Sequence, residues 1–232
     1  MPVALVTGGS AGLGRALARS LADQGWTVVV DGRDGERLAA SVDRPGILPV
    51  AGDVTDAQHR ERLVAAVRMH GPLDLLVHNA STLGPLTSDT WLPRLADVTV
   101  EDLQHVWRTN LGAPLVLTTE LLPDLVAANG ILLAITSDAA VEHYPGWGLY
   151  GASKAGLEHL MATFAAESPE IAAYAVDPGD MRTQMHADAF PGEDISDRPA
   201  PESVVPQLLA LIAARPPSGR YRAADVLLGA GA

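Results

Sequence analysis

The sequence predicts an α/β protein: a doubly wound, seven-stranded parallel sheet flanked by helices on both faces, which is the Rossmann fold. Three observations predict it. Short apolar runs alternate with amphipathic stretches, the runs are apolar at almost every position, and a glycine-rich turn follows the first run. Strands that are apolar throughout are buried on both faces, as in parallel sheets. The length of 232 residues suits one domain, 1–232, better than two.

The apolar runs are expected to be strands, and the stretches between them helices. The expected strands are 3–8, 26–31, 46–53, 73–79, 130–137, 171–179 and, more weakly, 224–231. Helical patterns occupy 14–25, 57–71, 100–128, 148–167 and 201–215. The segment 181–200 is polar and interrupted by prolines, and we expect it to be a loop beside the substrate.

Composition narrows the function classes. A net charge of −12 opposes binding to nucleic acid, whose phosphates are bound by clustered Lys and Arg. The absence of cysteine excludes disulfides, thiol catalysis and Cys-ligated metal, and we expect no metal site. The chain shows neither a signal-like start nor a stretch of transmembrane length, so we expect a soluble cytoplasmic protein with no membrane partner.

The glycine-rich turn "TGGSAGLG" spans residues 7–14, with glycines at 8, 12 and 14. Such glycines allow a sharp turn and a close approach of the backbone to a pyrophosphate, and the following helix offers free N–H groups to the phosphates. A tight strand-to-helix turn without a ligand would show the same glycine spacing. The position after the first strand and before a helix favours the nucleotide interpretation.

The stretch "LYGASKAG" places Tyr150 and Lys154 four residues apart, so a helix brings them to one face. A phenol, with a pKa of about 10, is poorly matched to proton transfer near neutral pH. A neighbouring ammonium group favours the phenolate, and we therefore expect Lys154 to lower the pKa of Tyr150. Tyr-x-x-x-Lys pairs are also common on ordinary helix surfaces, so the spacing alone only permits an acid/base pair.

The order of the motifs resembles the short-chain dehydrogenase/reductase family, in its single-domain type with a Tyr-x-x-x-Lys active site. The motifs span almost the whole chain: TG-x-x-x-G-x-G, "GDV" at 52–54, "HNAS" at 78–81, "TNLGA" at 109–113, Ser137, the Tyr/Lys pair and "DPGDMRT" at 177–183. The resemblance implies an oxidoreductase that transfers a hydride between a nicotinamide and a ketone, an aldehyde or a secondary alcohol. A dinucleotide-sensing protein without turnover is the alternative outside enzymes.

The resemblance also implies roles for individual residues. Tyr150 would be the general acid/base, Lys154 would also bind the nicotinamide ribose, and Ser137 would hold the substrate oxygen. Asn110 would help to hold a water in a proton path through Lys154. Simpler alternatives stay open, since Ser137 could only cap a loop and Asn110 could only pack. The implied cofactor contacts are Gly8, Ser10, Gly12, Leu13, Gly14, Arg33, Asp53, Val54, Asn79, Ala80, Tyr150, Lys154, Pro178, Gly179, Met181 and Thr183.

The end of the second expected strand bears on the choice of nicotinamide cofactor. Gly32 stands where NAD-type members of the family commonly carry an acid, and Arg33 stands where NADP-type members commonly carry a base. Asp31 comes one residue early, so strand alternation should turn it away from the ribose. NADP(H) is therefore favoured. NAD(H) stays open, because a slip of one residue would bring Asp31 to the ribose and because Arg33 could be an ordinary solvated loop arginine.

Other residues carry narrower expectations. Ser81 replaces a glycine that is usual in the family, and His78 is expected to be a satisfied core residue. The substrate is expected to be a small molecule, with a pocket drawn from Trp91, His143, Tyr144, Trp147, Met185, His186 and Phe190 and walled by 82–98. Family members are commonly dimers or tetramers, often through the helices around 100–128 and 148–167, so a homo-oligomer is expected.

Overall fold

The seven strands form one parallel sheet in the computed structural model, which describes residues 1–86 and 92–227. The strand order is β3-β2-β1-β4-β5-β6-β7, and every neighbouring pair is parallel. The strands are β1 (Val3–Val6), β2 (Thr27–Gly32), β3 (Ile47–Ala51), β4 (Leu75–His78), β5 (Ile131–Ile135), β6 (Ala172–Asp177) and β7 (Gly219–Arg222). This arrangement confirms the predicted fold class.

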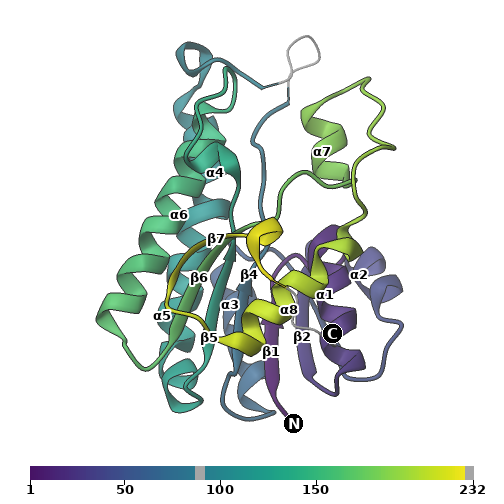
Figure 1. The fold of residues 1–232 in the computed structure, drawn as a ribbon, viewed down its shortest axis with the longest axis vertical. Helices are drawn as coiled ribbons and strands as arrows, with labels where there is room; N and C mark the ends of the chain where they lie inside the picture. Colours follow the sequence, from purple (N-terminus) through teal and green to yellow (C-terminus); the bar gives the residue numbers. More distant parts are fainter. Residues whose placement is uncertain (87–91, 228–232) are drawn as a thin grey trace.

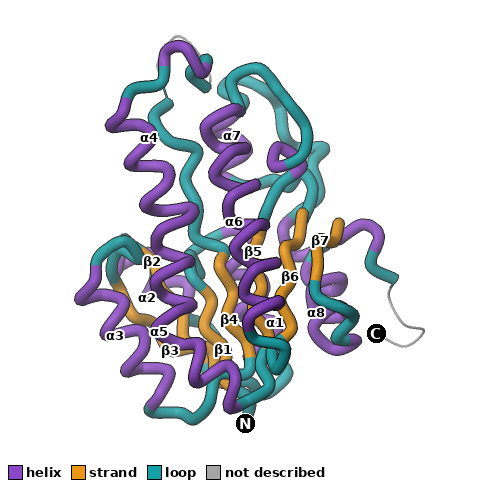
Figure 2. The backbone as a smooth tube through the Cα atoms, turned by 90° about the vertical axis from the view of Figure 1, so that its left-hand side faces the viewer, coloured by secondary structure: helices purple, strands orange, loops and turns teal. Residues whose placement is uncertain are grey.

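Helices cover both faces of the sheet (Figures 1 and 2). Alternate residues of β1 show why: Ala4 and Val6 join the core on one face, and Val3 and Leu5 join the core on the other. The first face is packed by α1 (Gly12–Asp23), α2 (Gly35–Ser41) and α8 (Val205–Ala214). The second is packed by α3 (Ala57–Arg68), α5 (Ala113–Ala127) and α6 (Gly148–Glu167). The near-continuous apolar strands are thus buried on both sides.

The position of the seventh strand differs from the prediction of 224–231. The strand is β7 at 219–222, and Ala223–Asp225 is a short 3₁₀ turn; residues 228–231 of the predicted strand lie outside the described part. β7 lies at the edge of the described sheet, next to β6, and is half-buried, with the Tyr221 ring edge-on to Tyr174 at 5.8 Å. An edge strand of this kind needs no continuous apolar run, so the sequence pattern did not reveal it.

Two helical regions also differ from the expected pattern. The stretch 100–128 is divided into α4 (Val100–Trp107) and α5 by a π-helical turn, Arg108–Gly112, which contains Asn110. The expected loop 181–200 contains a short helix, α7 (Gln184–Ala189). Helices as short as α2 and α7 show too few turns for a recognisable period in the sequence.

The strand order places the candidate site. β1 lies between β2 and β4, so the chain runs outward from β1 in both directions, and a crevice forms at the carboxyl ends of the strands where the order reverses. In Figure 1, α7 and the upper parts of α4 and α6 rise above this end of the sheet. Within the described residues, no helix combines the length and the apolar character needed to span a membrane.

Candidate active site

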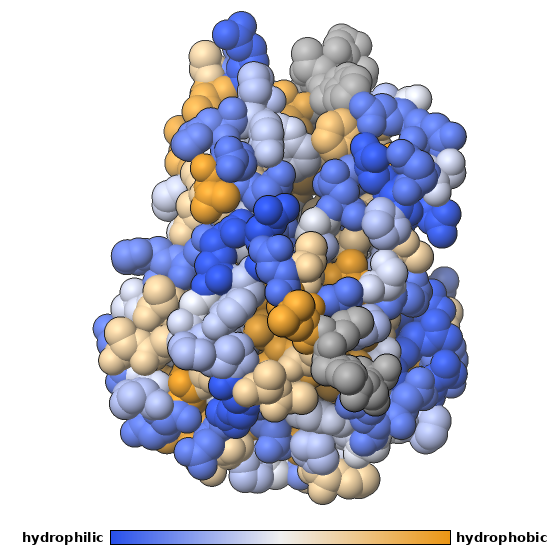
Figure 3. Space-filling view, viewed as in Figure 1, coloured by the Kyte–Doolittle hydropathy of each residue, from blue (hydrophilic) through white to orange (hydrophobic). Residues whose placement is uncertain are grey.

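A cavity of about 740 Å³ lies at the carboxyl ends of the strands. In Figure 3 the surface is hollowed between the part that carries α7 and the part that carries α6. Gly14 and Asn110 are the predicted site residues that lie outside the lining. The lining contains the other predicted site residues: Gly8, Ser10, Gly12, Leu13, Arg33, Asp53, Val54, Asn79, Ala80, Ser137, Tyr150, Lys154, Pro178, Gly179, Met181 and Thr183. The structure therefore brings together segments that are far apart in the sequence.

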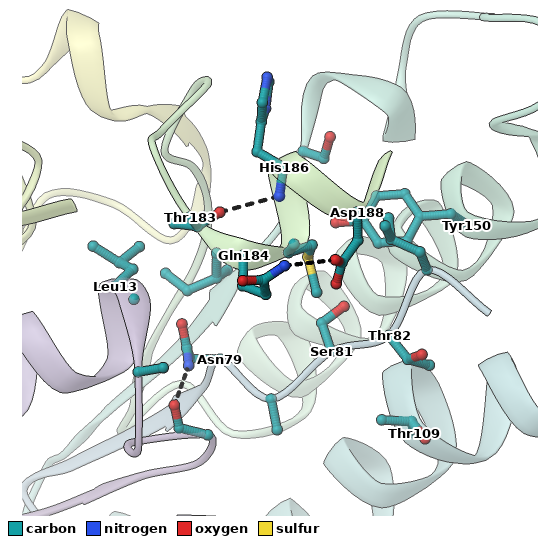
Figure 4. Close-up of a pocket in the computed structure, with 18 of the residues that line it drawn as sticks. Leu13, Asn79, Ser81, Thr82, Thr109, Tyr150, Thr183, Gln184, His186 and Asp188 are labelled. Atoms are coloured by element: carbon teal, nitrogen blue, oxygen red, sulfur yellow. Dashed lines mark hydrogen bonds between the residues drawn. The ribbon is translucent and has the colours of Figure 1, made fainter. Parts of the chain in front are cut away.

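The glycine-rich turn is held against the end of β4. Gly8 has a φ of +69°, and a Cβ at Gly14 would overlap both the Asn79 amide and the Gly8 carbonyl, so neither position accepts a larger residue. Asn79 Nδ2 donates to the carbonyls of Thr7 at 2.9 Å and Gly8 at 3.1 Å. Figure 4 shows one of these two hydrogen bonds. The Thr7 hydroxyl accepts from the amides of Asn79 and Ala80. Beside the first turn of α1, this arrangement leaves a backbone cradle that suits a pyrophosphate.

The ends of β2 and β3 form the other end of the cavity. Arg33 is exposed, while Val54 is buried and belongs to the core. Burial raises the pKa of Asp53, but a hydrogen bond from the Thr55 amide (2.8 Å) and the charge of Arg33 outweigh it, and the net pKa is lowered. Arg33 therefore places a free positive charge near Asp53 at the mouth. Asp31 points elsewhere, because its Oδ1 accepts the Gly8 amide at 2.6 Å.

Tyr150 and Lys154 are both buried on α6, but the ammonium does not meet the phenol oxygen. Lys154 Nζ donates to the Ile135 carbonyl at 2.8 Å and lies 5.6 Å from the centre of the Tyr150 ring. Burial lowers the pKa of Lys154 to about 8, against the opposing charge of Glu158. The ammonium therefore sits over the face of the ring, which is a favourable contact but not one with the phenol oxygen.

The pKa of Tyr150 is raised, so the expectation that Lys154 lowers it was wrong. Burial is the main cause; a hydrogen bond with Ser81 opposes it, and the charges of Asp138 and Asp177 add to it. Removing a phenol from water disfavours its charged form, and the ammonium is turned toward Ile135 instead of offsetting this loss. Tyr150 is consequently protonated at neutral pH, as a proton donor must be.

Asn110 is buried in the π turn, and its amide is fully occupied. Its Oδ1 accepts from the Thr82 amide (2.8 Å) and from Ser81 Oγ (3.2 Å). Its Nδ2 donates to the Thr82 carbonyl (2.8 Å) and to Ser153 Oγ (3.0 Å). A primary amide has no further hydrogen bonds to offer. The side chain therefore connects residues 81–82 to Ser153 on α6 and has no hydrogen bond left for a water in a proton path.

Ser137 lies directly after β5, and its hydroxyl serves as a cap while facing the cavity. It accepts from the Ala139 amide (3.1 Å) and donates to Asp138 Oδ1 (2.9 Å). Thr136 points to the other side of the strand and donates to Glu158 at 2.6 Å, as strand alternation predicts. Capping a loop and holding the substrate oxygen are thus compatible roles for Ser137. The capped hydroxyl keeps one free lone pair, and its O–H group can still rotate toward the cavity.

Arg220 on β7 supports this region, and the sequence interpretation missed it. Its Nη2 donates to the Ser137 carbonyl (3.2 Å) and to Asp177 (3.3 Å), and its Nε donates to Glu158 (3.0 Å). The guanidinium joins the end of β5, the end of β6 and α6 beneath the cavity. The short alternating pattern "GRYR" at 219–222 was the available signal, but the strand was expected further along the chain.

Segment 181–200 contributes a wall of the cavity through α7. Thr183 caps this helix, because its hydroxyl accepts a hydrogen bond from the His186 amide, and its methyl group faces Gly12. The Gln184 side-chain amide donates a hydrogen bond to the Asp188 carboxylate at 2.7 Å (Figure 4). Of the expected pocket residues, Trp147, Met185 and His186 line the cavity, and Phe190 packs on Trp147 at 5.7 Å. His143 and Tyr144 are exposed and outside the lining, and Trp91 lies outside the described residues.

His78 is a satisfied core residue, as predicted. It is buried, and its Nε2 lies 2.7 Å from the Thr118 hydroxyl. Burial, followed by the charge of Lys154, lowers the pKa of His78 to about 3. It is neutral at physiological pH and has no exposed edge for proton transfer.

Together, a glycine-rich turn at the switch point of a parallel sheet and a buried Tyr/Lys pair across the same cavity define a dinucleotide-dependent oxidoreductase. The chain belongs to the short-chain dehydrogenase family: the family model described as short chain dehydrogenase matches residues 2–194. This membership confirms the family that the motif order suggested.

Relatives and solved structures agree with this family. An NADPH-dependent aldehyde reductase-like protein, chloroplastic, from Arabidopsis thaliana is 30% identical, over 97% of this chain and 84% of that protein. The oxidoreductase YciK of Escherichia coli K12, described as uncharacterized, is also 30% identical, over 90% and 85%. A structure from Escherichia coli CFT073 complexed with NADPH matches with a TM-score of 0.86 and 29% identity, over 96% of each chain.

Proposed function

We propose that this protein is an NADP(H)-dependent carbonyl reductase that converts a ketone or an aldehyde to an alcohol. One observation carries the proposal: a buried phenol, held in its protonated form, faces the same cavity as a backbone cradle for phosphates and a free arginine. The NADPH-dependent relative and the NADPH-bound neighbour support this choice of cofactor.

The residues present suit this cofactor. The 8–14 turn would hold the pyrophosphate, Arg33 the 2′-phosphate, Asp53 and Val54 the adenine, and Thr183 the nicotinamide end. Glycine at 8 and 14 lets the turn close against Asn79, because a Cβ at either position would overlap Asn79 Nδ2. When bound, NADPH supplies the hydride that is added to the carbonyl carbon.

The chain itself supplies the proton. Tyr150 Oη would donate it to the carbonyl oxygen, and the Ser137 hydroxyl would turn from Asp138 to hold that oxygen. Lys154 would then stabilise the phenolate that remains by its charge. The Ser81 hydroxyl would turn from Asn110 Oδ1 to donate a hydrogen bond to it. The raised pKa keeps Tyr150 protonated, which is the form that reduction requires, whereas alcohol oxidation requires the phenolate.

A titration with both cofactors tests the cofactor assignment. We expect NADPH to bind this chain at least about tenfold more tightly than NADH, because a charge-assisted contact to the 2′-phosphate contributes about 1.5–3 kcal/mol. Quenching of the four tryptophans can report both affinities. Tighter NADH binding would favour the NAD-dependent alternative, and the absence of binding to either would contradict the enzyme assignment.

Ser81 offers a prediction about pH. Ser81→Ala removes the hydrogen bond that opposes the rise in the pKa of Tyr150, so that pKa should rise further. In the oxidation direction, where Tyr150 must be deprotonated, kcat/KM at a fixed pH below that pKa should therefore fall by up to about tenfold. Ser81→Thr keeps the hydroxyl and should keep the wild-type profile. Identical profiles for the wild type and Ser81→Ala would rule out this contact.

We also propose a homo-oligomer. Large apolar side chains are exposed on α4 and α5, at Leu103, Trp107, Leu115 and Val116, with exposed fractions of 37–42%. An exposed apolar surface of this kind is typical of subunit contacts. Sedimentation velocity should give a dimer or a tetramer, and a monomer at micromolar concentration would contradict this proposal.

A further inference from the structure

Asp31, the acid at the end of β2, is bonded to the glycine-rich turn. Its Oδ1 accepts the Gly8 amide at 2.6 Å, and its backbone carbonyl accepts the Gly9 amide at 2.8 Å. Asp31 is only 2% exposed. A carboxylate this buried requires hydrogen-bond partners. Both the carboxylate and the backbone carbonyl of Asp31 accept hydrogen bonds from amides of the turn.

His59 on α3 is the partner of the second carboxylate oxygen. Its Nε2 lies 3.3 Å from Asp31 Oδ2, its Nδ1 lies 3.3 Å from Arg62 Nη2, and its ring is fully buried. A guanidinium can only donate, so Nδ1 is the acceptor and Nε2 carries the hydrogen that is donated to Asp31. A continuous chain of hydrogen bonds thus runs from Arg62 through His59 and Asp31 to Gly8.

The same imidazole also packs beneath the turn after β3. A Cβ at Gly52 would overlap the His59 ring, so only glycine allows this packing. Gly8, Asp31 and Gly52 all line the cavity. His59 therefore ties together the phosphate-binding turn, the end of β2 and the segment that leads to Asp53.

We propose that Asp31 and His59 are a positioning pair that holds the glycine-rich turn ready for the pyrophosphate, and that Asp31 does not select between NADP(H) and NAD(H). This inference rests on the proposed dinucleotide site. Both oxygens of Asp31 are engaged inside the fold, by the Gly8 amide and by His59. An acid next to Gly32 is thereby compatible with a cofactor that carries a 2′-phosphate.

A positioning acid and a selecting acid predict opposite effects. Removing a selecting acid should tighten NADPH binding and weaken NADH binding, since its repulsion of the 2′-phosphate and its bond to the ribose are both lost. Removing a positioning acid should weaken both dinucleotides by the same factor. It should spare adenosine 2′-monophosphate, which has no pyrophosphate and binds only the end near Arg33.

The test measures three dissociation constants, for NADPH, NADH and adenosine 2′-monophosphate, with the wild type, Asp31→Ala and Asp31→Asn. Asp31→Ala should weaken both dinucleotides by about tenfold and the monophosphate by less than about twofold. Asp31→Asn keeps an oxygen for the Gly8 amide but sets its NH2 group against the N–H of His59 Nε2, so it should weaken both dinucleotides equally, by about three- to tenfold. Asp23→Asn is the matched control, because Asp23 is an exposed acid at the end of α1, paired with Arg44, and should change none of the three.

Three results would overturn the positioning role. They are tighter NADPH binding in either Asp31 variant, unchanged binding in Asp31→Ala, or a parallel loss of the monophosphate, which would indicate a general loss of structure. Asp31→Asn preserves the shape of the side chain and decides the question if Asp31→Ala does not fold: equal weakening of NADPH and NADH supports the positioning role, and unchanged or tighter NADPH binding overturns it. A wild type that binds neither dinucleotide would instead refute the proposed function, and this inference with it.

Discussion

Tyr150→Phe is expected to lower kcat for carbonyl reduction by about 10²–10⁴-fold, the range that general acid catalysis usually contributes. The substitution removes the proton that the carbonyl oxygen must receive. It should leave the fold and the NADPH affinity almost unchanged, because the ring keeps its packing, including its edge-on contact with Trp147 at 5.7 Å. Single-turnover kinetics with saturating NADPH would measure this loss directly.

Tyr221→Phe is the matched control for this experiment. This substitution removes one hydroxyl hydrogen bond, from Tyr221 to the Pro217 carbonyl, but Tyr221 lies on β7 outside the cavity. Its kcat should stay within about twofold of the wild type, as is usual for substitutions away from a site. A kcat for Tyr150→Phe within tenfold of the wild type would rule out Tyr150 as the acid.

Arg33→Ala is expected to weaken NADPH binding by about 10–100-fold and to leave NADH binding nearly unchanged. Arg33 is exposed beside Asp53 at the cavity mouth, so its guanidinium is free to bind a 2′-phosphate. Replacing it removes both the charge and the hydrogen bonds. The ratio of the two dissociation constants, measured for wild type and variant, checks the prediction.

Arg222→Ala is the control, because it removes one positive charge from an exposed position on β7. It shows whether a weaker affinity in Arg33→Ala comes from a lost contact with the 2′-phosphate or only from the change in the net charge of the protein. It should change both affinities by less than about twofold. Equal weakening of NADPH and NADH in Arg33→Ala would contradict the contact with the 2′-phosphate. It would also support the simpler interpretation of Arg33 as a solvated loop residue.

Features that depend on local pattern could be predicted from the sequence. Buried parallel strands require apolar side chains on both faces, so six strands were visible as runs such as "WTVVVD". The turn at Gly8 needs a positive φ, which made it visible as glycine. Most predicted site residues line one cavity, because the carboxyl ends of parallel strands meet at one edge.

Features that depend on side-chain direction and burial could not be predicted. Spacing placed Tyr150 and Lys154 on one face of α6, but it could not show that Nζ would turn to the Ile135 carbonyl. Strand alternation predicted that Asp31 points away from the ribose. It could not predict the hydrogen bond of Asp31 with the Gly8 amide or its contact with His59. Arg220 was missed because half-buried edge strands carry no strong apolar pattern.

Reduction of a carbonyl by NADPH, followed as cofactor consumed and alcohol formed, is the most direct test of the proposed function. The purified chain would be incubated with NADPH and a panel of aliphatic and aromatic aldehydes and ketones. We predict that at least one of them gives alcohol in equal amount to the NADPH oxidised, with the wild type and not with Tyr150→Phe. NADPH oxidation without alcohol, or equal alcohol formation by the Tyr150→Phe variant, would contradict a reductase in which Tyr150 supplies the proton.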